Sequence, residues 1–305
     1  LWRWTFPVNQ LNQQTEQLSP LSSRPAYTET ENELTVKANK RTFIFSKKDG
    51  QLKGVSVDNR KISFANGPRF IGARRADRSL DQFYNHDDEK AKEKDRTYSE
   101  FPDAAVFTKL DVKEDGGNLV VTANYKLGNL DKAQWTINPS GDLALDYTYN
   151  FSGVVDLMGI RFDYPEDQVI SKRWLGAGPY RVWQNRIHGT QYDVWENDYN
   201  DPIPGETFTY PEFKGYFGDV SWMNIQTKEG TISLTNETPD AYIGVYQPRD
   251  GRDRLLYTLP ESGISVLNVI PPVRNKVNST DLCGPSSQPK WVNGPQTGRV
   301  IFRFM

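Results

Sequence analysis

The chain has 305 residues, a formal charge of −2 and 12% aromatic residues. The near-zero charge lacks the basic footprint of nucleic-acid-binding proteins, so we expect no nucleic-acid partner. No apolar run of about 18 residues is present, so we also expect no membrane-spanning helix. Many aromatic residues combined with 23 glycines and 19 prolines predict a β-rich chain with frequent turns.

The single cysteine, Cys283, permits no internal disulfide and is compatible with a reducing or an oxidising compartment. We expect it to be a buried structural thiol.

The chain begins at Leu1 without a visible signal peptide, so we interpret it as a processed protein or an excised piece of a longer one, and favour the excised piece. We expect a bacterial periplasmic or extracellular location, and no cofactor.

Residues 1–30 are predicted to form an N-terminal strand followed by an extended connector. Trp2, Trp4 and Phe6 alternate as one face of a strand would, and the polar tract Asn9–Pro25 has no periodicity. We expect the aromatic residues to dock on a larger body. Residues 31–305 show no sharp change in composition, so we predict that they form a single β domain.

From Glu33 onward, short runs that alternate apolar and polar residues are separated by turn sequences such as Lys47–Gly50 and Asp115–Gly117. The predicted strands are Leu34–Ala38, Thr42–Ser46, Leu52–Val57, Val106–Val112, Leu119–Tyr125, Leu143–Phe151, Gly159–Tyr164, Val169–Leu175, Gly215–Ile225, Thr231–Asn236, Tyr242–Tyr246, Ile264–Ile270 and Arg299–Phe304. No helix of three turns is predicted. An immunoglobulin-type sandwich has about 7 to 9 strands, so this pattern favours a larger all-β sandwich of two antiparallel sheets.

The segment Asn85–Arg96 carries charges of both signs in one run, which is typical of a solvated loop or a short exposed helix. A metal site at His86–Asp88 is the alternative. We do not favour it, because the acidic run lacks the ordered glycine turn of a cation-binding loop.

The stretch Trp174–Arg186 contains two glycines and a proline within an aromatic and basic run. This pattern excludes a helix and predicts an ordered turn that leaves a strand. Trp183, Asn185, Arg186, His188 and Trp195 would suit a sugar site, because a pyranose stacks on an indole while amides and guanidinium groups bind its hydroxyls. Alternatively, the aromatic residues fill the core of a wide sandwich.

Several segments together resemble the C-terminal domain of family 2 β-galactosidases. They are Gly159–Pro165, Trp174–Tyr180, Asn185–Arg186, Gly189–Trp195, Tyr210–Gly215, Asp219–Trp222 and Asp281–Pro285, with a fainter match at Asn66–Arg69. The family's Trp-Arg-Ala-Pro run is replaced by Phe70–Arg78, and Cys283 stands where some members have a substrate-contacting tryptophan. These departures suggest a branch that acts on another glycan.

The resemblance implies a β-supersandwich of the galactose-mutarotase-like type that follows a catalytic barrel in the parent chain. In that family the catalytic glutamates lie in the barrel, so this piece alone is expected not to hydrolyse a glycoside. It would pack on the barrel and contact carbohydrate. The candidate carbohydrate-binding residues are Trp183, Asn185, Arg186, His188, Trp195, Glu212 and Asp281.

Two other hypotheses remain open. An aldose 1-epimerase on the same fold would need a general acid and a general base, for which His188 with Glu212 or Glu196 is the available set. A structural module would use its aromatic surface to dock another domain.

Overall fold

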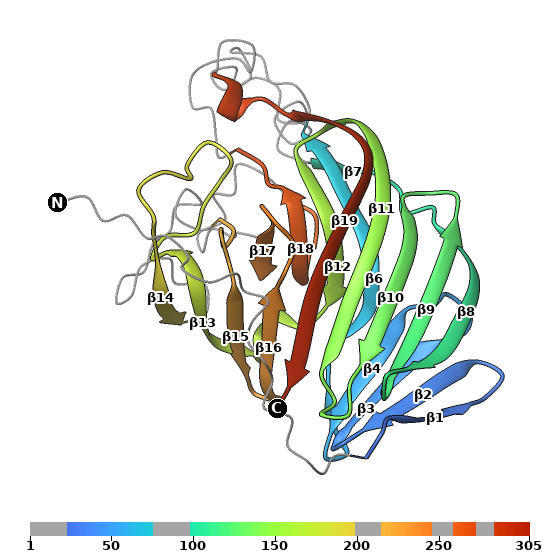
Figure 1. The fold of residues 1–305 in the computed structure, drawn as a ribbon. Helices are drawn as coiled ribbons and strands as arrows, with labels where there is room; N and C mark the ends of the chain where they lie inside the picture. Colours follow the sequence, from blue (N-terminus) through green and yellow to red (C-terminus); the bar gives the residue numbers. More distant parts are fainter. Residues whose placement is uncertain (1–22, 76–97, 199–214, 246–258, 273–283) are drawn as a thin grey trace.

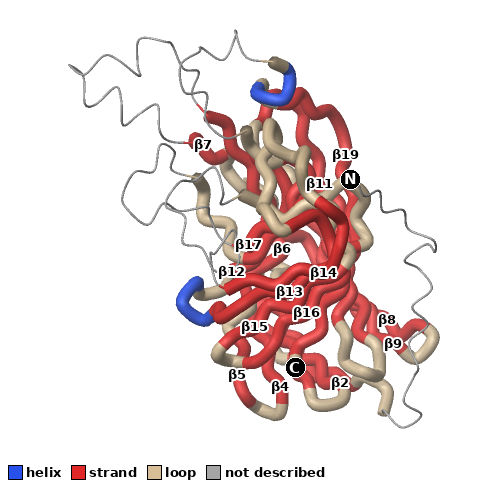
Figure 2. The backbone as a smooth tube through the Cα atoms, turned by 90° about the vertical axis from the view of Figure 1, so that its left-hand side faces the viewer, coloured by secondary structure: helices blue, strands red, loops and turns tan. Residues whose placement is uncertain are grey.

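The computed structural model describes residues 23–75, 98–198, 215–245, 259–272 and 284–305. Strand dominates this part of the chain, with single turns of 3-10 helix at Glu166–Gln168 (η2) and Pro285–Ser287 (η5) (Figure 2). In the same ranges no helix is long and apolar enough to cross a membrane. The strands are β1 (Ala26–Glu29), β2 (Glu33–Ala38), β3 (Arg41–Ser46), β4 (Leu52–Val57), β5 (Arg60–Ile62), β6 (Ala65–Arg75), β7 (Tyr98–Glu100), β8 (Val106–Asp115), β9 (Asn118–Lys126), β10 (Leu130–Ile137), β11 (Leu143–Val155), β12 (Leu157–Asp163), β13 (Val169–Gly178), β14 (Gln191–Asp198), β15 (Trp222–Thr227), β16 (Gly230–Asn236), β17 (Tyr242–Val245), β18 (Ile264–Val269) and β19 (Lys290–Phe304).

The described strands form two large antiparallel sheets (Figure 1). The first sheet runs in the order β1-β2-β3-β4-β6-β12-β18-β17, with β5 paired to β4 and β7 paired to β6. The second sheet runs in the order β14-β13-β15-β16-β19-β11-β10-β9-β8. This arrangement confirms the predicted all-β sandwich of two large sheets.

The main core lies between the two sheets because each strand buries every second side chain. On β9, for example, Leu119, Val121 and Ala123 are buried, whereas the residues between them are half-exposed. Aromatic rings from both sheets meet in this core. The Phe162 ring of β12 lies 5.4 Å from the Phe302 ring of β19, measured between centroids, in an edge-on contact.

A second, smaller core covers part of the opposite, outer face of the first sheet. Ile71 and Ala73 of β6 point away from the main core and pack with Val182, Trp183 and Tyr216. The Trp183 and Tyr216 rings meet edge-on at a centroid distance of 5.6 Å. The segment that follows β13 therefore folds over the first sheet and anchors there by its own apolar side chains.

Most predicted strands are present, with three corrections. Predicted strand Gly215–Ile225 begins only at Trp222, and the preceding residues form a loop with isolated bridges at Tyr216 and Phe217. Strands β1, β5, β6, β7, β10 and β14 were not predicted, and β19 extends nine residues further toward the N-terminus than expected. The predicted loop at 85–96 and the region 1–22 lie outside the described residues. The division into units 1–30 and 31–305 stays a prediction.

Candidate functional site

A polar cleft of about 750 Å³ opens on the outer face of the first sheet, beside the second core. Its walls come from β4, β5, β6, β12 and the loop before β18. The residues that line it are Lys53, Lys61, Ser63, Ala65, Asn66, Arg69, Arg161, Asp163, Tyr164, Pro165, Glu166, Glu261, Ser262 and Gly263. A volume of this size lies within the range of small-molecule sites, roughly 300–1,000 Å³.

Asp163, at the end of β12, is the centre of the cleft's hydrogen-bond network. Its carboxylate forms an ion pair with Arg69 of β6 and accepts a hydrogen bond of 2.8 Å from Asn66 Nδ2. The antiparallel register of β6 and β12 brings these residues together, because Arg161 pairs with Arg69 and Asp163 with Ala65. The side chain of Asp163 is 48% exposed, so a ligand can reach its remaining lone pairs.

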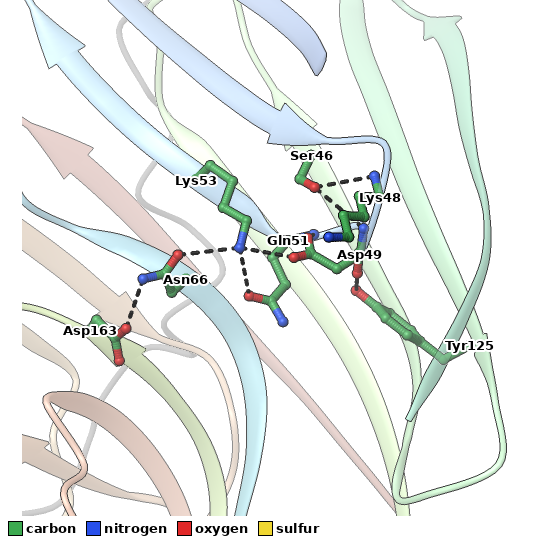
Figure 3. Close-up of polar contacts among 8 residues, drawn as sticks. All are labelled: Ser46, Lys48, Asp49, Gln51, Lys53, Asn66, Tyr125 and Asp163. Carbon is green, nitrogen blue, oxygen red and sulfur yellow. Dashed lines mark hydrogen bonds and ion pairs between the residues drawn. The ribbon is translucent and has the colours of Figure 1, made fainter. Parts of the chain in front are cut away.

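The network continues from Asn66 toward the turn between β3 and β4 (Figure 3). Lys53 Nζ donates to Asn66 Oδ1 at 3.4 Å and lies 2.9 Å from Asp49 Oδ2. Asp49 also accepts a hydrogen bond from the Gln51 backbone N–H. The chain of contacts holds Asn66 in a fixed orientation toward Asp163.

Arg161 is the second guanidinium of the cleft. It donates to the backbone carbonyl of Glu261 and lies 3.8 Å from the Glu100 carboxylate. Burial, and then the positive charge of Arg69, lower the pKa of Arg161. A guanidinium nevertheless stays protonated at neutral pH. The Nε atoms of Arg69 and Arg161 are both buried, and neither has a hydrogen-bond partner.

Glu229, in the turn between β15 and β16, braces one wall of the cleft. Its carboxylate accepts hydrogen bonds from Ser63 Oγ at 2.6 Å and from the Tyr164 hydroxyl at 3.0 Å. Burial, reinforced by the Glu229 charge, raises the pKa of Tyr164, so its hydroxyl keeps the proton it donates. This wall is therefore a fixed part of the site.

The charges that line the cleft nearly cancel, since Lys53, Lys61, Arg69 and Arg161 face Asp163, Glu166 and Glu261. Arg69 and Asp163 pair with each other, Arg161 donates to a backbone carbonyl, and Lys53 pairs with Asp49. A site of this kind offers alternating hydrogen-bond donors and acceptors with little net charge. That pattern suits hydroxyl groups, which donate and accept at once.

The residues predicted from the sequence lie away from this cleft. Trp183 is 2% exposed in the second core, so its ring faces are covered by protein. Asn185 is half-buried and donates to Ser287 Oγ at 3.3 Å, whereas Arg186 and His188 are exposed in the same turn. Trp195, on β14, is half-buried and packs against the main core.

Glu212 and Asp281, like Cys283 and His86, lie outside the described residues. The structure thus brings Asn185, Arg186 and His188 together in one turn and places Trp183 and Trp195 against different cores. Trp174, at the start of the glycine-rich stretch, is a core residue at 1% exposure.

Sequence reasoning did not select the cleft residues. A signal was nevertheless present, because Arg161 and Asp163 are the polar members of an otherwise apolar strand and Asn66–Arg69 also belongs to a family-like segment. In the structure these two segments pair with each other. A charged residue at every second position of a buried strand is the pattern that would have identified the site.

Comparison with known proteins gives a family match. The sequence model of the family described as β-galactosidase small chain matches residues 37–272. The chain matches no curated protein sequence.

The solved structures that match this chain include galactose 1-epimerase from Lactobacillus acidophilus NCFM, with a TM-score of 0.44, 8% identity and coverage of 93% of this chain and 99% of that one. They also include a putative mutarotase from Salmonella typhimurium, with a TM-score of 0.39, 9% identity and 94% of each chain covered.

Proposed function

We propose, for a chain that belongs to the β-galactosidase small chain family, a role as the carbohydrate-contacting domain of a family 2-type glycoside hydrolase. In this proposal the chain is not catalytic by itself. A barrel domain of the same parent protein would supply the catalytic glutamates and pack against it. The expected location is the bacterial periplasm or the extracellular space.

The polar cleft around Asp163 is the observation that carries the proposal. It joins two segments that resemble family sequences, and its donors and acceptors are nearly balanced in charge. A neutral sugar would bind through hydroxyls to the half-exposed Asp163 carboxylate and to the exposed Lys61 ammonium group. The exposed Pro165 and the half-buried Ala65 offer a small apolar surface for the ring face.

Isothermal titration of the 305-residue chain with lactose and galactobiose tests the proposal. We expect binding that weakens at least about tenfold in Asp163→Asn, because a hydrogen bond to a charged group contributes about 1.5–3 kcal/mol. Asp111→Asn is the matched control, since Asp111 is also a half-exposed carboxylate in an ion pair, here with Lys109, but lies on β8. Its affinity should equal that of the unchanged chain. Equal binding by all three proteins, or binding by none, would contradict the proposal.

Two activity assays separate the alternatives. Release of nitrophenol from a nitrophenyl β-galactoside by this chain alone would show that it is catalytic. Polarimetry with freshly dissolved α-galactose tests the epimerase hypothesis, in which His188 and Glu212 would act on the sugar. Acceleration that is lost in His188→Ala would favour an epimerase over the non-catalytic role.

A further inference from the structure

A strip of outward-facing residues follows β11 and β19 along the second sheet. We define the outer strip as the alternate residues of Asp146–Val154 on β11 and of Trp291–Arg299 on β19. Tyr147 and Tyr149 point into the main core, as do Val300 and Phe302, so the residues between them must face outward. The two strands pair directly, with Val154 opposite Trp291 and Asp146 opposite Arg299.

Trp291, at one end of the outer strip, is 72% exposed. The other described tryptophans are buried or half-buried, including the sequence-predicted candidates Trp183 and Trp195. An indole that stays exposed on a sheet face contributes little buried area to the core. Large flat aromatic surfaces of this kind bind ligands by stacking.

Hydroxyl and amide groups continue from the indole along the strip. Ser152 Oγ donates to Asn293 Oδ1 at 2.8 Å. These two residues are partners across the β11–β19 ladder, two positions along each strand from the Val154–Trp291 pair. Two positions further along β11, the Asn150 side chain donates to the Asp131 carboxylate. These short side chains are held in place by their mutual contacts, and their remaining donors and acceptors face solvent.

A hollow of about 370 Å³ lies at the other end of the strip. Lys132, Asp146, Thr148, Glu237, Thr297 and Arg299 line it. Arg299 lies between two carboxylates, with Nη1 2.5 Å from Asp146 Oδ2 and Nε 2.9 Å from Glu237 Oε2. The two positive and two negative charges of the hollow therefore balance, which favours a neutral polar ligand over an ion.

We propose that the outer strip binds an extended, neutral polysaccharide chain. The Trp291 indole stacks on the face of one sugar ring, the Ser152 and Asn293 side chains bind hydroxyls of the next, and the hollow at Arg299 accepts a further sugar. From residue 291 to 299 the strand rises roughly 26 Å, at about 3.3 Å per residue. This length exceeds one monosaccharide, so the strip selects chains rather than free sugars.

The proposed strip is independent of the Asp163 cleft. The cleft lies on the outer face of the first sheet and the strip on the outer face of the second, with the main core between them. Tethering to a polysaccharide would hold the chain, and any domain joined to it, on an insoluble or branched substrate.

Affinity electrophoresis in native gels that contain galactan, xyloglucan or hydroxyethylcellulose tests the strip. We expect at least one of these neutral polymers to retard the 305-residue chain. Trp291→Ala should abolish the retardation, and Trp291→Phe should keep part of it because an aromatic face remains. Leu127→Ala is the matched control. Leu127 is an apolar residue 74% exposed at the turn between β9 and β10, so its variant should migrate like the unchanged chain.

Circular dichroism of each variant checks that the fold is retained, which the exposure of both positions leads us to expect. Migration unaffected by all three polymers overturns the proposal. So does equal retardation of Trp291→Ala and the unchanged chain, or retardation by polygalacturonate alone, which would indicate an ionic surface. Asp163→Asn should remain retarded, so loss of the cleft does not mimic loss of the strip.

Discussion

The position of the Asp163 carboxylate depends on a series of side-chain contacts that extends to the turn between β3 and β4. It is held by Asn66, which Lys53 holds in turn, and Lys53 is positioned by Asp49 (Figure 3). Asp49 lies in the turn after β3, where its backbone N–H donates to Ser46 Oγ and its carboxylate accepts a hydrogen bond from the Gln51 backbone N–H. The turn therefore has a role at the cleft as well as in the hairpin.

The Asp49 charge should make stability depend on pH. Burial alone would raise the pKa of Asp49, but hydrogen bonds from Lys53 and the Gln51 backbone lower it below its ordinary value. A lowered pKa means that the stabilisation is present above the pKa of the unfolded chain, near 4, and is lost as pH falls through the folded value. Both partners are about one-third exposed, so solvent screening limits the effect to about 0.5 kcal/mol.

Urea unfolding of Asp49→Asn between pH 7 and pH 2.5 measures this term. Asparagine keeps the acceptor for Gln51 and removes only the charge. The variant should be less stable than the unchanged chain at pH 5–7 and should converge with it below pH 3. A stability difference that stays constant across this range would show that the charge is not responsible.

The tryptophans show the limit of residue-level prediction. Composition and local pattern treat Trp183 and Trp291 alike, yet one is 2% exposed and the other 72%. Trp183 is covered because a distant segment at Tyr216 packs on it, and nothing near Trp183 in the sequence encodes that contact. Trp291 stays exposed because its strand position faces outward, which depends on the register of the whole strand β19.

Turn residues inside a strand account for two of the differences from the predicted strands, the missed strand β6 and the missed first part of β19. Strand β6 contains Asn66-Gly67-Pro68, and β19 contains Gly294-Pro295. Such residues usually end a strand. Here β19 pairs with β11 without a break from Phe302 to Lys290, so long-range pairing outweighs the local preference. Strands with uninterrupted alternation, such as β9, were predicted because burial of one face is sufficient to specify them.

Gly159 is required where β12 passes between β6 and β18. A Cβ at this position would lie 2.2 Å from the Val266 carbonyl oxygen and 2.7 Å from Leu267 Cα. Both are backbone atoms of β18, so the two strands would have to separate. We expect Gly159→Ala to lower the free energy of unfolding by about 3 kcal/mol, near the upper end of the usual cost of overpacking a core.

Gly54→Ala is the control for this prediction. Gly54 also lies within a strand, but a Cβ there would meet only the Ile44 side chain, at 3.8 Å from Cδ1 and 4.0 Å from Cβ, which are ordinary contacts. Its stability should be unchanged or slightly raised, because alanine loses less backbone entropy on folding. Urea denaturation of both variants decides the matter, and equal stabilities would refute the argument from close packing.

For the whole molecule, the fold could be predicted because each strand carries its own pattern of buried and exposed positions. The cleft could not, because it is assembled by sheet order. Arg69 and Asp163 are 94 residues apart in sequence and become neighbours only because β6 and β12 are adjacent in the first sheet. The outer strip likewise joins β11 to β19, whose registered residues Asp146 and Arg299 are 153 positions apart.

The two-sheet architecture leads to a last prediction, that the two binding surfaces act independently. They lie on opposite outer faces, and substitutions that are distant and share no partner combine with a coupling below about 0.5 kcal/mol. In titrations with lactose, Asp163→Asn should weaken binding and Trp291→Ala should leave it unchanged. With soluble galactan as the ligand the roles should reverse, so that Trp291→Ala weakens binding and Asp163→Asn leaves it unchanged.

The double variant measures the coupling between the two surfaces. If they are independent, its loss of binding free energy for each ligand should equal the sum of the losses in the two single variants. A coupling above about 1 kcal/mol would mean that the ligand, or a change in the sheets, connects the two faces, since strongly coupled sites usually share a contact. Additivity would instead support a domain in which one sheet holds a sugar at the cleft while the other anchors a polysaccharide chain, with the main core acting as a rigid spacer between them.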